Sequence, residues 1–329
     1  MKLITLDKKN IGKCLQVPIY SYDGVILLKS NSLLTEKNIN HLKNVGINTA
    51  YISDETSDDL SLQETLESPV RLKCLKDLNR IFSSIKTIKV LNNKVIFSLS
   101  EDLISNLNIS ENAFLFNNIA KSDKFSSLSV HSLDVAILTA IVGMKKNYPM
   151  SKLIELVSVA LLHDIGKVFE ENDTHCKLGY DIIKNSPNFS TMIYVSTLQH
   201  HEYEDGSGFP NKYKGDKIHE YAKIVGICNE YLNLISSKEK TFLPNEAVET
   251  ITAMASSKFD KEIYKHFLSS IYCYPNGLTV HLNNGLEGMV VMQNKNYPLR
   301  PVIGVCNGSE TKFINLLFEL TLFIEKIVI

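Results

Sequence analysis

The sequence has no tryptophan, no CxxC pair among its six cysteines and almost no net charge. Its 35 lysines and arginines balance 36 aspartates and glutamates, and the sequence pI is near 6.8. A chain-wide basic field for binding a nucleic-acid polymer is therefore absent. Scattered cysteines without a signal peptide are typical of reduced thiols, and we expect a cytoplasmic protein.

Long uninterrupted apolar runs are also missing, so we expect no membrane span. The nearest approach is the C-terminal run FINLLFELTLFIEKIVI, which four polar residues interrupt: Asn315, Glu319, Glu325 and Lys326. These interruptions favour a packed terminal element over a membrane anchor.

Periodicity and turn signals divide the 329 residues into four segments of a mainly α protein. We expect a small N-terminal α/β unit over 1–53, an acidic linker with connecting helices over 54–119, a helical domain over 120–270 and a small β element over 271–329. The N-terminal unit is predicted from a turn at Asp23-Gly24 and from Thr35, which precedes a helical pattern. The β element is predicted from apolar runs around a turn at Asn284-Gly285.

Five histidines and one aspartate gather in the middle segment, mostly at predicted helix ends: His131, His163, Asp164, His175, His200 and His201. Adjacent residues on a helix point about 100° apart, so we expect each doublet to serve two neighbouring ions, with Asp164 bridging them. The set suits two metals about 3.5–4 Å apart. Histidine and carboxylate ligands fit iron, manganese, nickel or zinc and do not separate them. The other four histidines are interpreted as ordinary surface or core residues: His41, His219, His266 and His281.

The order of these motifs resembles the HD-GYP domain, a bacterial subgroup of the HD metal-dependent phosphohydrolases. The resemblance rests on HDIGK at 163–167, HHE at 200–202, DGSGFP at 205–210, AKIVGICNEY at 222–231 and KFDKEI at 258–263. It covers most of the chain, and its motif string is specific. It implies an HD-type helical bundle with a small N-terminal α/β unit and a small C-terminal β element.

The resemblance also implies an activity, hydrolysis of cyclic di-GMP to linear pGpG or on to GMP by a hydroxide that bridges two metals, most readily iron or manganese. The metal ligands that it implies are His131, His163, Asp164, His175, His200, His201 and Asn229. Asp164 and Lys167 are the implied catalytic residues. The implied substrate-binding residues are Lys167, Asp205, Gly206, Gly208, Phe209, Pro210 and Lys238.

This sequence departs from the family pattern at four places. Asn229 replaces the last metal-binding aspartate, and Phe209 replaces the tyrosine of the GYP motif. Ser127 stands where some members have a glutamate for a third metal, and only VFEENDT separates Lys167 from His175. These departures keep open a weakened domain that binds cyclic di-GMP or a partner protein without turnover. An HD nucleotidase or an oxygen-using di-iron enzyme is a third alternative, which DGSGFP disfavours.

The N-terminal unit carries no phosphorelay, haem or cofactor motif. We expect it to regulate the domain or to form a homodimer, and the sequence leaves the two open. Diguanylate cyclase-type proteins or other signalling proteins are the expected protein partners.

Overall fold

The computed structural model describes residues 2–53, 63–110, 113–114, 119–120, 123–236, 242–307 and 310–327. Contacts within the chain divide it into two compact units. The first contains Met1–Glu64, Ser110–Ser122 and Ile271–Ile329, and the second contains Thr65–Ile109 and Asp123–Ser270. The contacts thus group both ends of the chain in one unit, whereas the four-segment division expected from the sequence stays a prediction.

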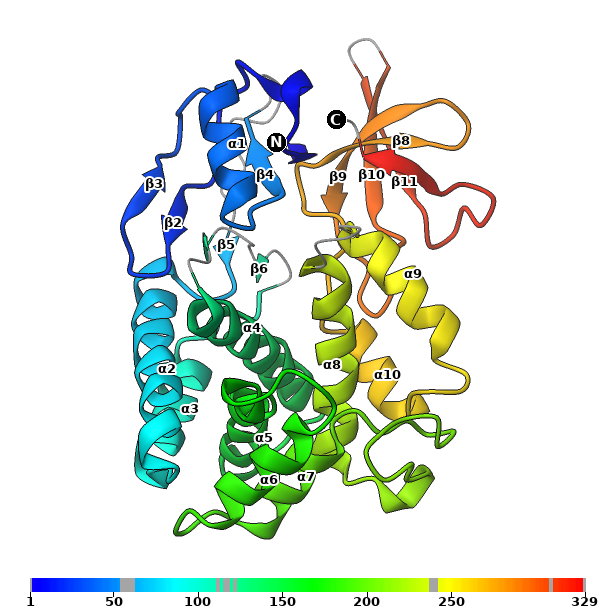
Figure 1. Cartoon of the computed structure of the whole chain (residues 1–329). Coiled ribbons are helices and arrows are strands. Elements are labelled where there is room, and N and C mark those ends of the chain that lie inside the picture. Colours follow the sequence, from blue (N-terminus) through cyan, green and yellow to red (C-terminus); the bar gives the residue numbers. More distant parts are fainter. Residues whose placement is uncertain are drawn as a thin grey trace. The chain divides into compact units, whose positions relative to one another are not determined.

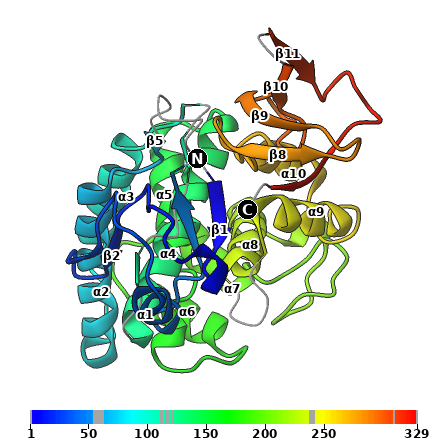
Figure 2. The same ribbon diagram turned by 90° about the horizontal axis from the view of Figure 1, so that it is seen from above.

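The second unit is helical, which confirms the expected mainly α fold. Its elements are α2 (Ser68–Ile88), α3 (Asn93–Ser105), α4 (Lys124–Lys145), α5 (Met150–Leu162), η2 (Ile165–Val168), α6 (His175–Lys184), α7 (Thr191–Gln199), η3 (Gly215–Lys217), α8 (Glu220–Ser236), α9 (Pro244–Met254) and α10 (Lys261–Leu268). Helix α4 lies between α2 and α8 in both ribbon views and packs against α2, α5 and α8 (Figures 1 and 2). Helix α4 is therefore the centre of this unit.

A capping box begins α4, and an ion pair links α4 to α2. Asp123 accepts a hydrogen bond from the backbone N–H of Ser126, whose side chain accepts one from the N–H of Asp123, so the two form a capping box. Arg71 of α2 contacts Asp134 of α4 in an ion pair with an N–O distance of 2.5 Å, and both side chains are largely buried. The pair fixes α2 against the helix that carries His131.

Helix α4 is long and apolar enough to cross a membrane on those criteria alone. However, 78% of its most apolar 18-residue window is buried inside the protein, as in the core helix of a helical bundle.

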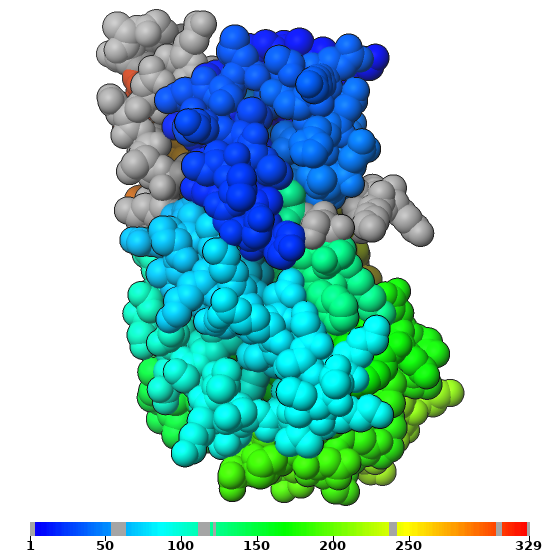
Figure 3. Space-filling view, turned by 60° about the vertical axis from the view of Figure 1, so that its left-hand side comes forward, coloured from blue at the N-terminus to red at the C-terminus, as the bar shows by residue number. Residues whose placement is uncertain are grey.

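Helices α2 and α3 (light blue and cyan) form part of the molecular surface seen in Figure 3. An exposed ion pair between Lys73 and Asp102, 2.7 Å apart, links these two helices.

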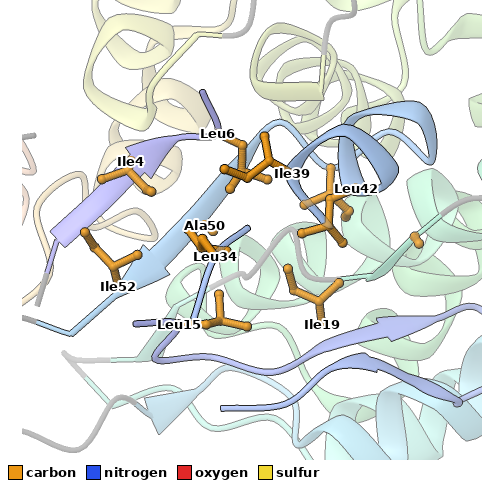
Figure 4. Close-up of a cluster of buried hydrophobic side chains, with 11 residues drawn as sticks. Ile4, Leu6, Leu15, Ile19, Leu34, Ile39, Leu42, Ala50 and Ile52 are labelled. Atoms are coloured by element: carbon orange, nitrogen blue, oxygen red, sulfur yellow. The ribbon is translucent and has the colours of Figure 1, made fainter. Parts of the chain in front are cut away.

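The N-terminal part of the first unit is an α/β fold. Its elements are β1 (Lys2–Thr5), η1 (Lys8–Asn10), β2 (Ile19–Ser21), β3 (Ile26–Leu28), α1 (Glu36–Asn44) and β4 (Thr49–Ile52). Strands β1 and β4 pair antiparallel, while β2 pairs with β3 and, in parallel, with β7 (Ile119–Ala120). As predicted, Gly24 turns the chain between β2 and β3, and the Thr35 side chain caps α1. Leu6, Ile39 and Leu42 belong to the buried apolar cluster that joins these elements (Figure 4).

The C-terminal part is a five-stranded antiparallel sheet in the order β11-β10-β9-β8-β12, which confirms the expected β element. Its strands are β8 (Thr279–Leu282), β9 (Glu287–Met292), β10 (Val302–Asn307), β11 (Glu310–Asn315) and β12 (Ile324–Ile327). A two-stranded pair, β5 (Gln63–Glu64) with β6 (Ala113–Phe114), completes the described strands. The tail is less packed than expected, because Phe318 and Leu320 between β11 and β12 are 76% and 75% exposed.

Candidate metal centre

Three of the predicted ligands stand at helix ends, as the sequence indicated. His163 directly follows α5, His175 begins α6 and His200 directly follows α7. The Nδ1 atom of each ring donates a hydrogen bond of 2.7 Å to the carbonyl oxygen three residues earlier, on Ala160, Asn172 and Thr197 respectively. In a neutral imidazole this bond leaves the lone pair on Nε2. All three rings are therefore oriented to present Nε2 as a ligand atom.

Asp164 lies between four of the histidines. Its Oδ2 is 3.3 Å from Nε2 of His163 and 3.6 Å from Nε2 of His131. Its Oδ1 is 3.3 Å from Nε2 of His175 and 3.5 Å from Nε2 of His200. Each carboxylate oxygen thus faces a different pair of histidines, which is the arrangement expected of a carboxylate that bridges two ions.

The buried atoms of this cluster need a cation. Nε2 of His163, Nε2 of His200 and Oδ1 of Asp164 are buried without a hydrogen-bond partner among the described residues. Burial lowers the pKa of His200 to about 4, and burial together with the neighbouring His200 lowers the pKa of His201 further, so both rings are neutral at pH 7. Lone pairs that face carboxylate oxygens repel each other unless a positive ion lies between them. The residues present therefore fit divalent metal ions.

Lys167 provides one positive charge at this cluster. Its Nζ lies 2.6 Å from Oδ2 of Asp164, and its side chain remains 27% exposed. Burial alone would raise the pKa of Asp164, but its close contacts with His163, His175 and His200 outweigh burial and hold that pKa well below its usual range. The central carboxylate is thus ionised.

The remaining predicted ligands complete two groups of donor atoms. One group is His131, His163 and Asp164, and the other is His175, Cys176, His200 and His201; within each group the ligand atoms lie within 4.8 Å of one another. We expected the doublet His200-His201 to serve two ions, as His163-Asp164 does. The structure instead places both rings in one group, because their centroids lie only 4.2 Å apart just after the end of α7.

Asn229 of α8 also reaches the cluster. It is buried, and its Oδ1 lies 2.8 Å from Nε2 of His131. The next residue, Glu230, points elsewhere and accepts a hydrogen bond of 3.3 Å from the hydroxyl of Tyr203. Glu230 therefore does not replace the missing aspartate. The structure brings all seven predicted ligands together, although their role as ligands stays a prediction.

The glycine of HDIGK allows this convergence. A Cβ atom on Gly166 would lie 2.0 Å from the carbonyl oxygen of His175, a distance that no side chain can occupy. The backbone of η2 can therefore touch the beginning of α6 only at a glycine. This contact places His175 next to Asp164.

The predicted substrate loop DGSGFP is held beside the histidines by Glu202, which sequence analysis did not assign to the site. The Glu202 carboxylate is buried and accepts backbone hydrogen bonds of 2.7 Å from Asn211 and 2.9 Å from Tyr213. A Cβ on Gly208 would lie 2.3 Å from the carbonyl oxygen of His201, so this glycine serves the close packing of two backbone segments. The sequence signal that could have identified Glu202 was its place in the HHE motif, directly after the doublet His200-His201.

Phe209 of the same loop contacts the metal cluster directly. Its ring stacks on His201 with centroids 4.5 Å apart and an interplanar angle of 19°. Asp205 is exposed and accepts hydrogen bonds from Ser207, and Gly206 has a positive φ of 80°. Pro210 is exposed, and Lys238 lies outside the described residues. The substrate-binding roles of these residues stay predictions.

Cys176 is a second neighbour that sequence analysis missed. Its side chain is buried, and its Sγ lies 3.4 Å from Nε2 of His175. Burial raises the pKa of the Cys176 thiol to about 12 in the metal-free protein. Its position next to His175 was visible in the sequence, but only the structure shows where its sulfur points.

Comparison with known proteins finds a similar family model and similar structures. Residues 115–263 match the sequence model of the HD domain. Bd1817, an HDG"Y"P protein from Bdellovibrio bacteriovorus, has a similar structure, with a TM-score of 0.52 and 15% identity over 80% of this chain and 98% of that one. The structural likeness at this identity shows the fold alone.

Two curated relatives have similar sequences. The cyclic di-GMP phosphodiesterase PdeB of Borreliella burgdorferi is 29% identical over 55% of this chain and 53% of its own length. The cyclic di-GMP phosphodiesterase PA4108 of Pseudomonas aeruginosa is 26% identical over 58% of this chain and 50% of its own length. The chain thus spans about half the length of the curated relatives that it matches.

Proposed function

Since residues 115–263 match the sequence model of the HD domain and the chain carries a motif string that resembles the HD-GYP pattern, we propose that this protein is a metal-dependent phosphodiesterase that hydrolyses cyclic di-GMP. One observation supports the proposal above all: both oxygens of Asp164 face pairs of histidine nitrogens, two of which are buried without a partner among the described residues. The names of the two curated relatives support cyclic di-GMP as the substrate.

The residues divide naturally between two ion positions. His131, His163 and Oδ2 of Asp164 would hold one ion, with the Asn229 oxygen nearby. His175, His200, His201 and Oδ1 of Asp164 would hold the other. When bound, divalent ions supply Lewis acidity toward a phosphodiester and a water of lowered pKa. We propose iron or manganese for this pair.

The other groups of the site act on the substrate. Lys167 lies at the edge of the cluster with a partly exposed ammonium group, where it can stabilise negative charge on a phosphate oxygen. Phe209, which stacks on His201, positions the loop next to the reacting phosphate. We propose linear pGpG as the first product, because the two donor groups adjoin each other in one cluster, which can act on one phosphodiester at a time.

Asn229 supports a second candidate function. Its neutral amide stands beside His131, where an aspartate would add a negative charge to balance two divalent ions. Weaker metal retention would leave a domain that binds cyclic di-GMP without cleaving it. The protein would then be a receptor for the same ligand.

Incubation of the metal-loaded protein with cyclic di-GMP tests both candidates. We expect elemental analysis to find a stoichiometric amount of bound metal. We also expect ion-exchange chromatography to show conversion of cyclic di-GMP to pGpG, and this conversion should stop when a chelator removes the metal. Tight binding of cyclic di-GMP by calorimetry without any product would establish the receptor. Metal retention without either binding or turnover would contradict both candidates.

We also propose a cytoplasmic location. All six cysteines are free thiols in the structure, which is typical of a reducing compartment. Fractionation of the source cells with an antibody to the protein tests this location, and recovery in an oxidising compartment would contradict it.

A further inference from the structure

The thiol of Cys176 lies inside the donor cluster. Cys176 is the second residue of α6 and its side chain is fully buried. Its Sγ is 3.4 Å from Nε2 of His175 and within 4.8 Å of the ligand atoms of His200 and His201. Adjacent residues of a helix usually diverge by about 100°, so this approach depends on the long imidazole of His175 turning back over the start of the helix.

The spacing is that of two ligands on one ion. In a tetrahedral site with metal–nitrogen bonds of about 2.0–2.1 Å and metal–sulfur bonds of about 2.3 Å, nitrogen and sulfur ligands lie roughly 3.5 Å apart. The observed separation of 3.4 Å between Sγ and Nε2 agrees with this value.

Independent atoms point to an ion in the same space. Nε2 of His200 and Oδ1 of Asp164 are both buried without a hydrogen-bond partner in the part of the chain that the structure describes, and they lie 3.5 Å from each other. His200 and Cys176 belong to the same group of donors. The thiol is therefore not a lone cysteine, because it lies in a group of donors that includes an unpaired buried nitrogen of His200.

We propose that Sγ of Cys176 is a ligand of the ion held by His175, His200 and His201. The inference rests on the proposed metal centre and adds a sulfur ligand to it. On coordination a metal–sulfur bond replaces the S–H bond, and the released proton leaves to solvent. A thiolate favours zinc, cobalt and iron over manganese, so at this position a sulfur ligand would narrow the proposed choice of iron or manganese to iron.

The ordinary alternative is a buried thiol that donates a weak hydrogen bond to Nε2 of His175. The two arrangements differ in what an ion at the site would contact. A hydrogen-bonding thiol gives a nitrogen and oxygen coordination sphere, whereas a ligand gives a sulfur-containing one. Spectroscopy of the bound metal therefore separates them without reference to activity.

The test is cobalt substitution of the full chain after chelation. We expect the wild-type protein to bind Co²⁺ and to show a thiolate-to-cobalt charge-transfer band in the near ultraviolet. Cys176→Ser should lose the band and lower the preference for Zn²⁺ over Mn²⁺ by about tenfold. Cys74→Ser, at a buried thiol of α2, is the matched control and should keep both.

X-ray absorption at the zinc edge of the wild-type protein needs no variant, which keeps the test sound if Cys176→Ser fails to fold. One sulfur scatterer at about 2.3 Å supports the proposal. If the bound metal shows only nitrogen and oxygen scatterers and no charge-transfer band, Cys176 is not a ligand, but the proposed metal centre is still supported. Failure of the protein to retain any metal overturns both.

Discussion

The ammonium group of Lys167 lies 2.6 Å from Oδ2 of Asp164, the same oxygen that faces His131 and His163. A lysine that the sequence assigns to substrate phosphate is thus paired with the central carboxylate of the metal-free site. An ion at Oδ2 would repel this ammonium group and release it toward the substrate. We therefore predict that metal loading and phosphate binding are coupled through this salt bridge.

Lys167→Met tests this coupling. The variant should retain metal at least as well as the wild-type protein, because a competing positive charge is gone. Its turnover of cyclic di-GMP should fall by about 10²-fold, because the charge that develops on the phosphate loses a partner. Metal content and steady-state kinetics measure the two effects. Lys177→Met, which removes an exposed lysine of α6 paired with Asp181, is the control; metal loss in Lys167→Met would contradict the assignment.

Asp164→Asn removes the charge of the carboxylate that we propose to bridge the two ions, with little change in shape. We expect loss of most bound metal and of all detectable turnover, because both ion positions share this residue. Elemental analysis and the product assay measure these losses. Asp181→Asn, at an exposed carboxylate of α6, should change neither. Hydrolysis that survives in Asp164→Asn would show that the proposed mechanism is wrong.

Much of this site could be predicted from the sequence. His163, His175 and His200 follow or begin apolar helices, so their periodic patterns already placed them at helix ends. The resemblance added Asn229 from a helix some thirty residues further along the chain, and the structure brings it within 2.8 Å of His131. Motif order carried this information because HDIGK and HHE directly follow core helices and AKIVGICNEY lies within one.

Other features depend on side-chain directions that a sequence does not contain. Glu202 and Cys176 both adjoin predicted ligands, but one turns toward the backbone of the DGSGFP loop and the other toward the donor cluster. The doublet His200-His201 follows the end of α7, where helical geometry no longer separates neighbours by a fixed angle. The exposure of Phe318 and Leu320 likewise depends on tertiary packing.

Asn229→Asp restores a charge beside His131. In the metal-free protein the new carboxylate is buried and should lower the free energy of unfolding. Metal binding should improve by about tenfold, because an anion replaces an amide next to the ion. Competition with a metal-binding dye and thermal melts with and without chelator measure both effects. Asn185→Asp, an exposed position, is the control. Unchanged metal affinity would show that Asn229 is not next to a bound ion.

Glu202→Gln tests how the substrate loop is held. The carboxylate accepts two backbone hydrogen bonds, and hydrogen bonds to charged groups contribute about 1.5–3 kcal/mol each. We expect the variant to keep its metal, to be less stable by about 2 kcal/mol and to bind cyclic di-GMP more weakly. Urea unfolding, metal analysis and calorimetry measure these three quantities. Glu249→Gln, at an exposed glutamate of α9, is the control. If the variant binds cyclic di-GMP with unchanged affinity, the DGSGFP loop is not part of the substrate site.

The pKa of His200 predicts how acid affects the metal-free protein. In the unfolded chain this histidine takes up a proton near its ordinary pKa of 6.5, whereas burial lowers the pKa in the folded protein to about 4. Between these values the unfolded state binds more protons, so the free energy of unfolding should fall as the pH falls from 6.5 to 4, by at most about 3 kcal/mol from this residue.

Urea unfolding of the chelated protein at a series of pH values measures this dependence. His200→Gln should flatten the slope over this range, whereas His41→Gln, at an exposed histidine of α1, should leave it unchanged. Bound metal should raise the stability most at neutral pH, because ions and protons compete for the same nitrogen atoms. A chelated wild-type protein that is equally stable at pH 6.5 and pH 4 would show that His200 is not held neutral by burial.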